Sequence, residues 1–455
     1  MFNSVSPVFS GYDGVRWSLL LILPAVILVF LCISSEVPKV VVVSMLVTAG
    51  VGSYFFPLSP PYVYSIFEAQ YWLVSLLFAG LVSRNRSFAS ILLKSRILVV
   101  VAFCFASLYI LTIVMGLLFW YQQGGGKVTD FLPFGFYNIR MWSHIATWII
   151  PLCCSCLFLM QSRLASRRRV AMIWGGVVLG LWFMVLLGSA ARGSMLAQGL
   201  AFLFMLALYR RKFWDIGKFW VYSFISGVVL YFIFVIAIPK ALFEQIGYYQ
   251  IFRTGGSGRG QLWEYALSLS FENFPFGVGS LAYSYRIPVD AYYATPHSLY
   301  FTWASEYGWL FVVTVVAIFF RFSFRAWRKE NVLSHNDSGL QLGVQFSVLS
   351  ALVHACVSGV FTSPVSQIVG FPVLAIYFAF CLDANKQCSC AVGRGRLVNY
   401  LSLLLFWLSI FIIYPSYTWW HSSKQDAVKY MEINHIGLAP RFWIHGRFVG
   451  NEDSE

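Results

Sequence analysis

Long apolar runs recur from one end of the chain to the other, and they restrict the fold more than any other feature. A helix needs about 20 apolar residues to cross the hydrocarbon of a bilayer. By hydropathy we count about 12 runs of that kind. They lie at 17–34, 38–56, 66–83, 97–120, 142–160, 170–188, 193–209, 219–238, 299–320, 340–361, 366–383 and 398–414. The runs lack the period-2 alternation of barrel strands, so we predict an all-α, polytopic membrane protein.

The composition and the charge agree with a membrane protein. Of the 455 residues 59% are hydrophobic and 11% are charged, whereas about a quarter of the residues in a soluble domain are charged. The net charge of +14 would suggest a nucleic-acid partner in a soluble protein. Here the basic residues gather in short loops, which is the ordinary signal of membrane topology. We expect no nucleic-acid partner, and we interpret the first run as an uncleaved span because no small-residue cleavage site follows it.

The basic loops predict which side faces the cytoplasm. If the spans alternate, five basic loops share one side, at residues 84–96, 163–169, 210–218, 321–329 and 386–396. The opposite, periplasmic side then holds the loops at 57–65, 121–141, 189–192, 239–298 and 362–365. The loop at 239–298 is much the longest, and short helices are expected in it. If all 12 spans alternate in direction, both termini, including the tail 415–455, lie outside. If one early run and one late run are not full spans, both termini lie inside. Residues 1–455 are expected to form one membrane domain.

Two arginines on the predicted outer side are candidate phosphate ligands. Arg192 lies in "GSAARGSML", at a tight junction between two spans, where an arginine can also simply reach the membrane surface. Arg259 lies in "GGSGRGQLWEYALSLSFENFPFGVGS", between a glycine turn and an amphipathic helix predicted from about Gln261 to Phe271. Unpaired N–H groups at a helix start and a planar guanidinium both suit an anion. A solvated loop arginine is the alternative for Arg259.

His297 is the candidate base. It follows Pro296, precedes an apolar run, and is the only histidine in the long outer loop. A neutral imidazole can accept the proton of a hydroxyl group, although a lone histidine at a membrane surface also often has a structural role. The outer loops contain no Asp-x-Asp pair, and no cysteine lies between Leu242 and His297. We therefore predict no metal, no cofactor and no disulfide in the long loop, and arginines would neutralise a leaving phosphate.

Three stretches resemble, in order, three blocks of the O-antigen ligase/O-antigen polymerase superfamily. They are "ARGSMLAQGLAFLF", "GSGRGQLWEYALSLSFENFPFGVGS" and "PHSLYFTWASEYGWLFVV", within residues 188–311. Members are bacterial inner-membrane glycosyltransferases that use undecaprenyl-diphosphate-linked glycans on the periplasmic face without a metal. The resemblance implies that Arg192 and Arg259 bind the lipid diphosphate and that His297 is the general base. The family usually has His-Asn where this chain has His297-Ser298.

Other polar residues carry weaker expectations. Glu306 matches the Glu-x-Gly of the family, and we favour a structural role for it. Arg253 and Arg140 are further candidates for substrate binding, with a topology anchor as the alternative for Arg140. His354 and Glu68 are further polar candidates, and they fall within predicted spans.

The resemblance implies a metal-independent, inverting glycosyltransferase of the inner membrane whose partners are a lipid-linked glycan donor, an acceptor glycan and membrane lipids. The short segment from Arg259 to His297 favours an O-antigen or surface-polysaccharide polymerase over an O-antigen ligase that acts on lipid A–core. A chain-length regulator or a flippase is a candidate protein partner. An oligosaccharyltransferase is a third branch. A transporter or a membrane scaffold is the alternative from another class, although transporters place ionisable groups near the middle of the bilayer.

Overall fold

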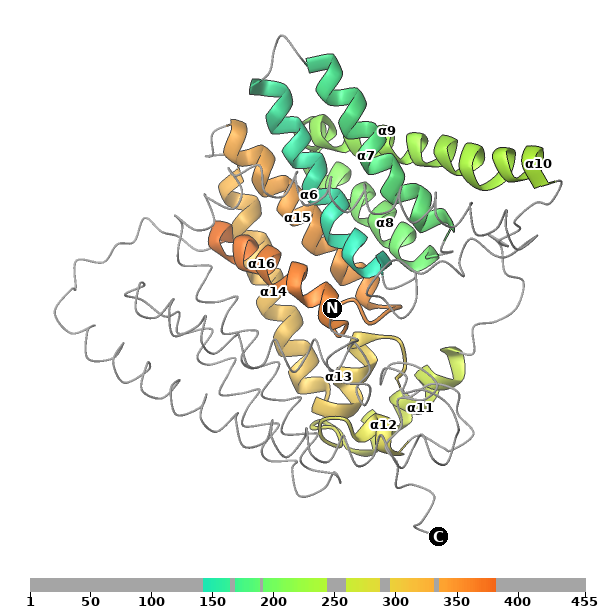
Figure 1. Ribbon diagram of the computed structural model, residues 1–455. Helices are drawn as coiled ribbons and strands as arrows, with labels where there is room; N and C mark the ends of the chain where they lie inside the picture. Colours follow the sequence, from blue (N-terminus) through green and yellow to red (C-terminus); the bar gives the residue numbers. More distant parts are fainter. Residues whose placement is uncertain are drawn as a thin grey trace, which may run out of the picture. The chain divides into compact units, whose positions relative to one another are not determined.

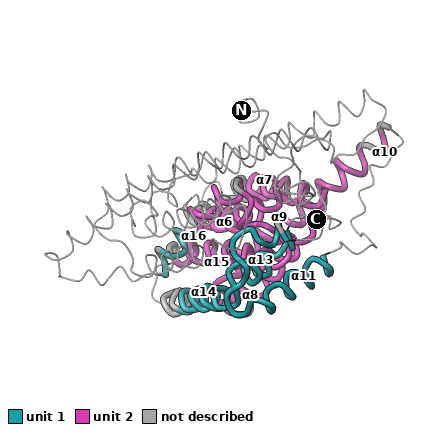
Figure 2. The backbone as a smooth tube through the Cα atoms, turned by 90° about the horizontal axis from the view of Figure 1, so that it is seen from below, with its two compact units in different colours: residues 1–89, 257–326, 374–455 teal, residues 90–256, 327–373 magenta. Residues whose placement is uncertain are grey.

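The computed structural model describes residues 142–163, 168–188, 191–243, 259–286, 295–330 and 335–381 (Figure 1). Every regular element in these ranges is a helix, as the all-α prediction requires. The predicted spans at 17–34, 38–56, 66–83, 97–120 and 398–414, and the tail 415–455, lie outside the described residues. The predicted number of spans and the single membrane domain therefore stay predictions. By its internal contacts the chain divides into two compact units (Figure 2).

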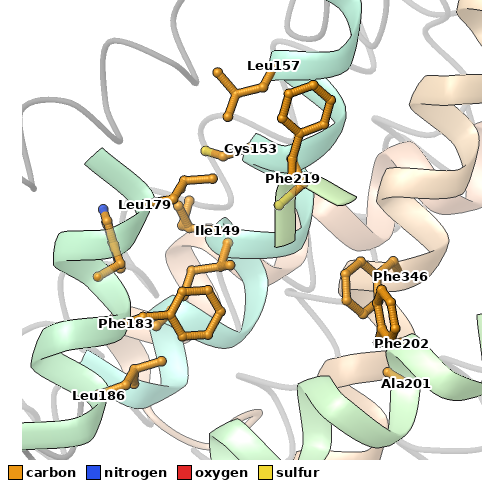
Figure 3. Packing of buried hydrophobic residues seen from close by; sticks show 14 of the residues in the cluster. Ile149, Cys153, Leu157, Leu179, Phe183, Leu186, Ala201, Phe202, Phe219 and Phe346 are labelled. Carbon is orange, nitrogen blue, oxygen red and sulfur yellow. The ribbon is translucent and has the colours of Figure 1, made fainter. Parts of the chain in front are cut away.

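In unit 2, residues 90–256 and 327–373, the described residues form a bundle of helices. Its described elements are α6 (Trp142–Arg163), α7 (Arg168–Gly188), α8 (Arg192–Tyr209), α9 (Arg211–Tyr231), the π-helical segment η6 (Phe232–Ala237), α10 (Ile238–Phe243), α15 (His335–Ala355) and the first part of α16 (Pro364–Cys381). Within the unit α6 packs against α15 and α7, α7 against α9, and α8 against α15. Side chains from these helices, among them Ile149, Phe183 and Phe346, form one buried apolar cluster (Figure 3).

Small residues let the helices of unit 2 approach closely. A Cβ on Gly227 of α9 would lie 2.9 Å from the carbonyl oxygen of Gly180 on α7. A Cβ on Gly343 of α15 would collide with Ser155 of α6. Lipid tails are as apolar as the helix surfaces, so close packing at small residues is a main source of helix association in a membrane. Small residues at these contacts therefore fit a membrane bundle.

In unit 2 three predicted helices agree with the structure, whereas one predicted loop and one predicted helix end are wrong. The runs predicted at 142–160, 170–188 and 193–209 are α6, α7 and α8. The basic loop predicted at 210–218 is wrong, because Arg210 alone connects α8 to α9: its φ is 50° and its N–H donates to the carbonyl of Leu206 at 2.8 Å. The run predicted at 340–361 ends early, at Ala355, because turn hydrogen bonds such as Val357 N–H to the His354 carbonyl replace the helix.

Unit 1, residues 1–89, 257–326 and 374–455, contains the short helices of the long loop. Its described elements are α11 (Arg259–Glu272), α12 (Ala282–Arg286), α13 (Leu299–Tyr307), α14 (Trp309–Glu330, to residue 326) and the end of α16. The predicted amphipathic helix is confirmed as α11, whose buried residues Leu262, Ala266 and Leu269 pack against Val278 and Tyr283. Short helices in the loop were expected, whereas its first residues, 239–243, belong to α10.

The single span predicted at 299–320 is wrong, because the helix breaks at Gly308. This glycine has a φ of 85°, and a Cβ on it would collide with the carbonyl oxygen of Pro275. A left-handed residue ends α13, and the chain restarts as α14 at Trp309. On the far side of α14, Phe319 stacks on Tyr377 of α16 with ring centroids 5.6 Å apart. Gly308 thus separates a short loop helix from a long apolar one.

Three described helices are long and apolar enough to cross a membrane. They are Trp142–Leu159, Arg192–Tyr209 and Arg211–Ala237. Shorter apolar helices among the described residues are Ile173–Gly188, Trp309–Phe324 and Val365–Phe378. These helices agree with the predicted class of membrane protein.

Candidate functional site

Arg259 is the first residue of α11 in unit 1. Its side chain is partly exposed, and the neighbouring Gly260 and Gln261 are exposed. The N–H groups of a first helical turn have no partner within the helix. Arg259 thus lies at a helix start, and its role as an anion ligand there stays a prediction.

The second turn of α11 holds the backbone next to His297. The indole Nε1 of Trp263 donates a hydrogen bond to the carbonyl oxygen of Pro296 at 2.8 Å. The Trp263 ring also packs against Phe301 of α13, with centroids 5.5 Å apart. Trp263 therefore ties the helix that starts with Arg259 to the residue that precedes His297. Sequence reasoning missed this tryptophan, because an indole beside a membrane is usually an interfacial anchor.

His297 has an unusual backbone conformation. Its φ is 52°, in the left-handed region that residues other than glycine rarely adopt. Its N–H donates to the Thr295 hydroxyl at 3.2 Å, and Ser298 follows as the extended N-cap residue of α13. Residues in such conformations persist only where the surrounding structure maintains them, and they are enriched at functional sites. Here the Trp263 hydrogen bond to the residue before His297 and the start of α13 just after it hold the backbone on both sides.

Arg259 acts electrostatically on His297. Burial, and after it the positive charge of Arg259, lower the pKa of His297 from its ordinary value of 6.5 to about 4. Both effects disfavour the imidazolium form. His297 is consequently neutral at pH 7 and able to accept a proton. The structure thus brings together two of the three residues predicted to form the site.

Glu306 lies near the end of α13, where its backbone anchors the loop. Its carbonyl accepts a hydrogen bond from the N–H of Gly279 at 2.8 Å, and the carbonyl of Ser305 accepts one from Val278 at 2.8 Å. The Glu306 side chain is buried. These contacts support the structural role that the sequence favours for it.

Arg192 belongs to unit 2, where it is exposed and is the first residue of α8. Both predicted diphosphate ligands therefore begin a helix. Two residues further on, the buried hydroxyl of Ser194 lies 2.8 Å from Thr147 Oγ1. Thr147 Oγ1 in turn lies 2.9 Å from Nδ1 of His354, and His354 packs edge-on against His144. A buried polar network on α6 and α15 thus fixes the first turn of α8.

Sequence reasoning missed Thr147 and Ser194 because single hydroxyl residues are common in apolar helices. Their signal becomes visible only when the packing brings them to His354. The candidates Arg253 and Arg140, as well as Glu68, lie outside the described residues. Among the described residues, no group of three or more His, Cys, Asp or Glu side chains is arranged to hold a metal ion.

Comparison with known proteins supports the family that the motifs resemble. Residues 175–320 match the O-antigen ligase family. The matched segment runs from α7 to α14 and includes Arg192, Arg259 and His297. No curated protein and no solved structure matches the chain. Residues 175–320 of this chain are therefore similar to the O-antigen ligase family, in the segment that carries the three motifs.

Proposed function

We propose that the protein is an inverting glycosyltransferase that moves a glycan from an undecaprenyl-diphosphate donor to a sugar hydroxyl at the periplasmic face of the inner membrane. The observation that carries this proposal is the pairing of Arg259 with a neutral His297 at the start of α11 and α13. A base and an anion ligand that influence each other electrostatically suit a reaction in which a hydroxyl loses a proton while a diphosphate departs.

In the proposed reaction His297 accepts the proton of the acceptor hydroxyl. The hydroxyl oxygen forms a bond to the anomeric carbon of the donor sugar, on the face opposite the leaving group. The bond between that carbon and the diphosphate oxygen breaks, and its electron pair leaves with the diphosphate. Arg259 and Arg192 stabilise the negative charge, and His297 then releases its proton. No metal ion takes part in this scheme.

The low pKa of His297 fits a base that acts only when the donor is bound. Beside Arg259 alone, the imidazolium form is disfavoured. A diphosphate held by Arg259 brings negative charge to the same place, and negative charge favours imidazolium. Donor binding therefore strengthens the base, which limits proton uptake by His297 in the absence of substrate.

Two branches of the family fit this chemistry, and we favour the polymerase. Between Arg259 and His297 the described chain contains α11 and the five-residue α12, and an enzyme that receives lipid A–core needs a wide docking surface. In the polymerase the acceptor is a second lipid-linked repeat, and a chain-length regulator or a flippase is the expected partner. The alternative is a ligase with lipid A–core as the acceptor.

The buried histidines of unit 2 bear on the transporter alternative. His144 is near the start of α6, His354 near the end of α15, and Ser194 near the start of α8. Ionisable groups of transporters typically lie near the middle of the bilayer on broken helices. The network of these residues lies at helix ends. This position favours a role in holding the turn of Arg192 and argues against a transport pathway.

A transfer assay with purified protein tests the proposal. The protein is incubated with undecaprenyl-diphosphate repeat units and a chelator, with and without lipid A–core, and the products are resolved by length. We expect Arg259→Ala and His297→Ala to lower the rate by about a hundredfold or more. Arg286→Ala is the matched control, because Arg286 is an exposed arginine of the same loop.

A ladder of longer lipid-linked glycans without lipid A–core supports the polymerase, and product only with lipid A–core identifies a ligase. Equal rates for wild type and both site variants would contradict the site. If no glycan is transferred, either with or without lipid A–core, the result would contradict the proposed function.

A further inference from the structure

Three phenylalanines are exposed at the end of α11 and on the turn that follows it. Phe271, Phe274 and Phe276 have 62%, 64% and 49% of their surface exposed. We call residues 271–276 the aromatic turn. Three large apolar side chains within six residues are an unusual feature for a loop that faces water, since clustered exposed apolar surface marks a site of interaction.

The aromatic turn is fixed to the first turn of α14. The Phe271 and Trp309 rings are 5.9 Å apart, and the Leu310 N–H donates to the carbonyl of Pro275 at 3.4 Å. Gly308 has no room for a side chain because the backbone of Pro275 and Phe276 lies against it. The phenylalanines are therefore held in place beside the start of an apolar helix.

One face of α14 is exposed and apolar from Leu310 to Phe324. Leu310, Val313, Phe320 and Phe324 are exposed by 57%, 60%, 66% and 48%. Their spacing of three, seven and four residues puts them on a single stripe of the helix. The other face, with Phe319 and Phe322, packs on α16. An exposed apolar stripe of this kind suits contact with lipid, and this one begins at Leu310, beside the aromatic turn.

We propose that the aromatic turn inserts into the membrane–water interface next to the first turn of α14. The continuity of its phenylalanines with the exposed stripe of α14 identifies the bilayer as the occupant of this surface. Exposed Glu272 within the turn limits the depth, because a carboxylate stays at the level of the headgroups. Exposed Gln261, Glu264 and Ser268 keep the remainder of α11 in water. The inference is independent of the proposed transfer reaction.

The test uses the native chain in nanodiscs that contain a phospholipid with a diazirine near the glycerol end of one acyl chain. After illumination, lipid adducts are mapped by mass spectrometry. We expect adducts on residues 271–276 within about twofold of those on residues 310–313, because both lie at the interface. We expect none on residues 261–268 of the same helix, which serve as the internal control.

Hydroxyl-radical labelling of the same nanodiscs distinguishes the other occupants. Adducts on residues 310–313 without adducts on the aromatic turn would overturn the proposal. Strong radical labelling of the turn would then mean that it lies in water, and protection from both reagents would mean that another protein or a second copy covers it. In the variant with Phe271→Ser, Phe274→Ser and Phe276→Ser, we expect the adducts of the turn to be lost and those of residues 310–313 to remain.

Discussion

The influence of Arg259 on His297 gives a prediction that needs no substrate. Diethyl pyrocarbonate modifies only neutral imidazole, so its rate at a histidine follows the neutral fraction. With a pKa of about 4, His297 keeps nearly all of its reactivity at pH 5.5. An ordinary histidine with a pKa of about 6.5 would keep only about 9% there. The expected difference at that pH is about tenfold.

The assay measures carbethoxylation of the peptide that contains His297 between about pH 3 and about pH 7.5, with a histidine peptide as the internal standard. In Arg259→Gln the repulsion between the guanidinium and imidazolium is lost, so the midpoint should rise. It should not reach 6.5, because burial is the larger cause of the shift. Arg286→Gln is the control and should leave the midpoint in place.

A midpoint near 6.5 in the wild-type protein would refute this reasoning, and so would a midpoint unchanged in Arg259→Gln. The same shift links folding to pH. Between about pH 6.5 and pH 4 the unfolded chain binds a proton at this residue that the folded chain does not bind. The stability contributed by neutral His297 is therefore complete above the unfolded pKa and is lost as the pH falls toward 4.

Three substitutions test the supports of the site. Trp263→Phe keeps the ring contact with Phe301 but removes the hydrogen bond to Pro296. Because one hydrogen bond contributes about 1 kcal/mol, we expect kcat to fall about fivefold to tenfold with little change in KM. Gly308→Ala should lower the free energy of unfolding by about 2 kcal/mol or more, because the left-handed backbone at Gly308 has no room for a methyl group. Thermal unfolding in detergent measures this loss. Gly260→Ala is the control, because a methyl group on Gly260 would contact no neighbouring atom. Thr147→Val should cost about 1–3 kcal/mol, because buried Ser194 and His354 lose a common partner. The exposed hydroxyl of Thr314 is the matched control, and equal losses in Thr147→Val and Thr314→Val would contradict the importance of the network.

The helices of the described chain could be predicted largely from hydropathy, because a membrane helix needs a continuous apolar stretch. The exceptions arise from backbone conformation. Arg210 adopts a left-handed turn that shortens a basic loop to one residue, and Gly308 breaks an apolar run because the aromatic turn occupies the space beside it. Hydropathy contains no information about such local geometry.

In the candidate site, too, some residues could be predicted from the sequence and others could not. Arg259 and His297 could be chosen from their residue types and from the motifs, and the structure brings them into electrostatic contact. The hydrogen bond from Trp263 and the network around Thr147 depend on contacts between residues that are 33 and 207 positions apart. No single-sequence pattern indicates such long-range pairs.

In the proposed reaction Arg259 and His297 act together on one donor. A double-mutant cycle on transfer, with kcat/KM measured for wild type, Arg259→Gln, His297→Gln and the double variant, tests it most directly. If the two residues act as a unit, the double variant should be about as slow as the slower single variant. Losses that simply multiply, as for two independent residues, would contradict the account.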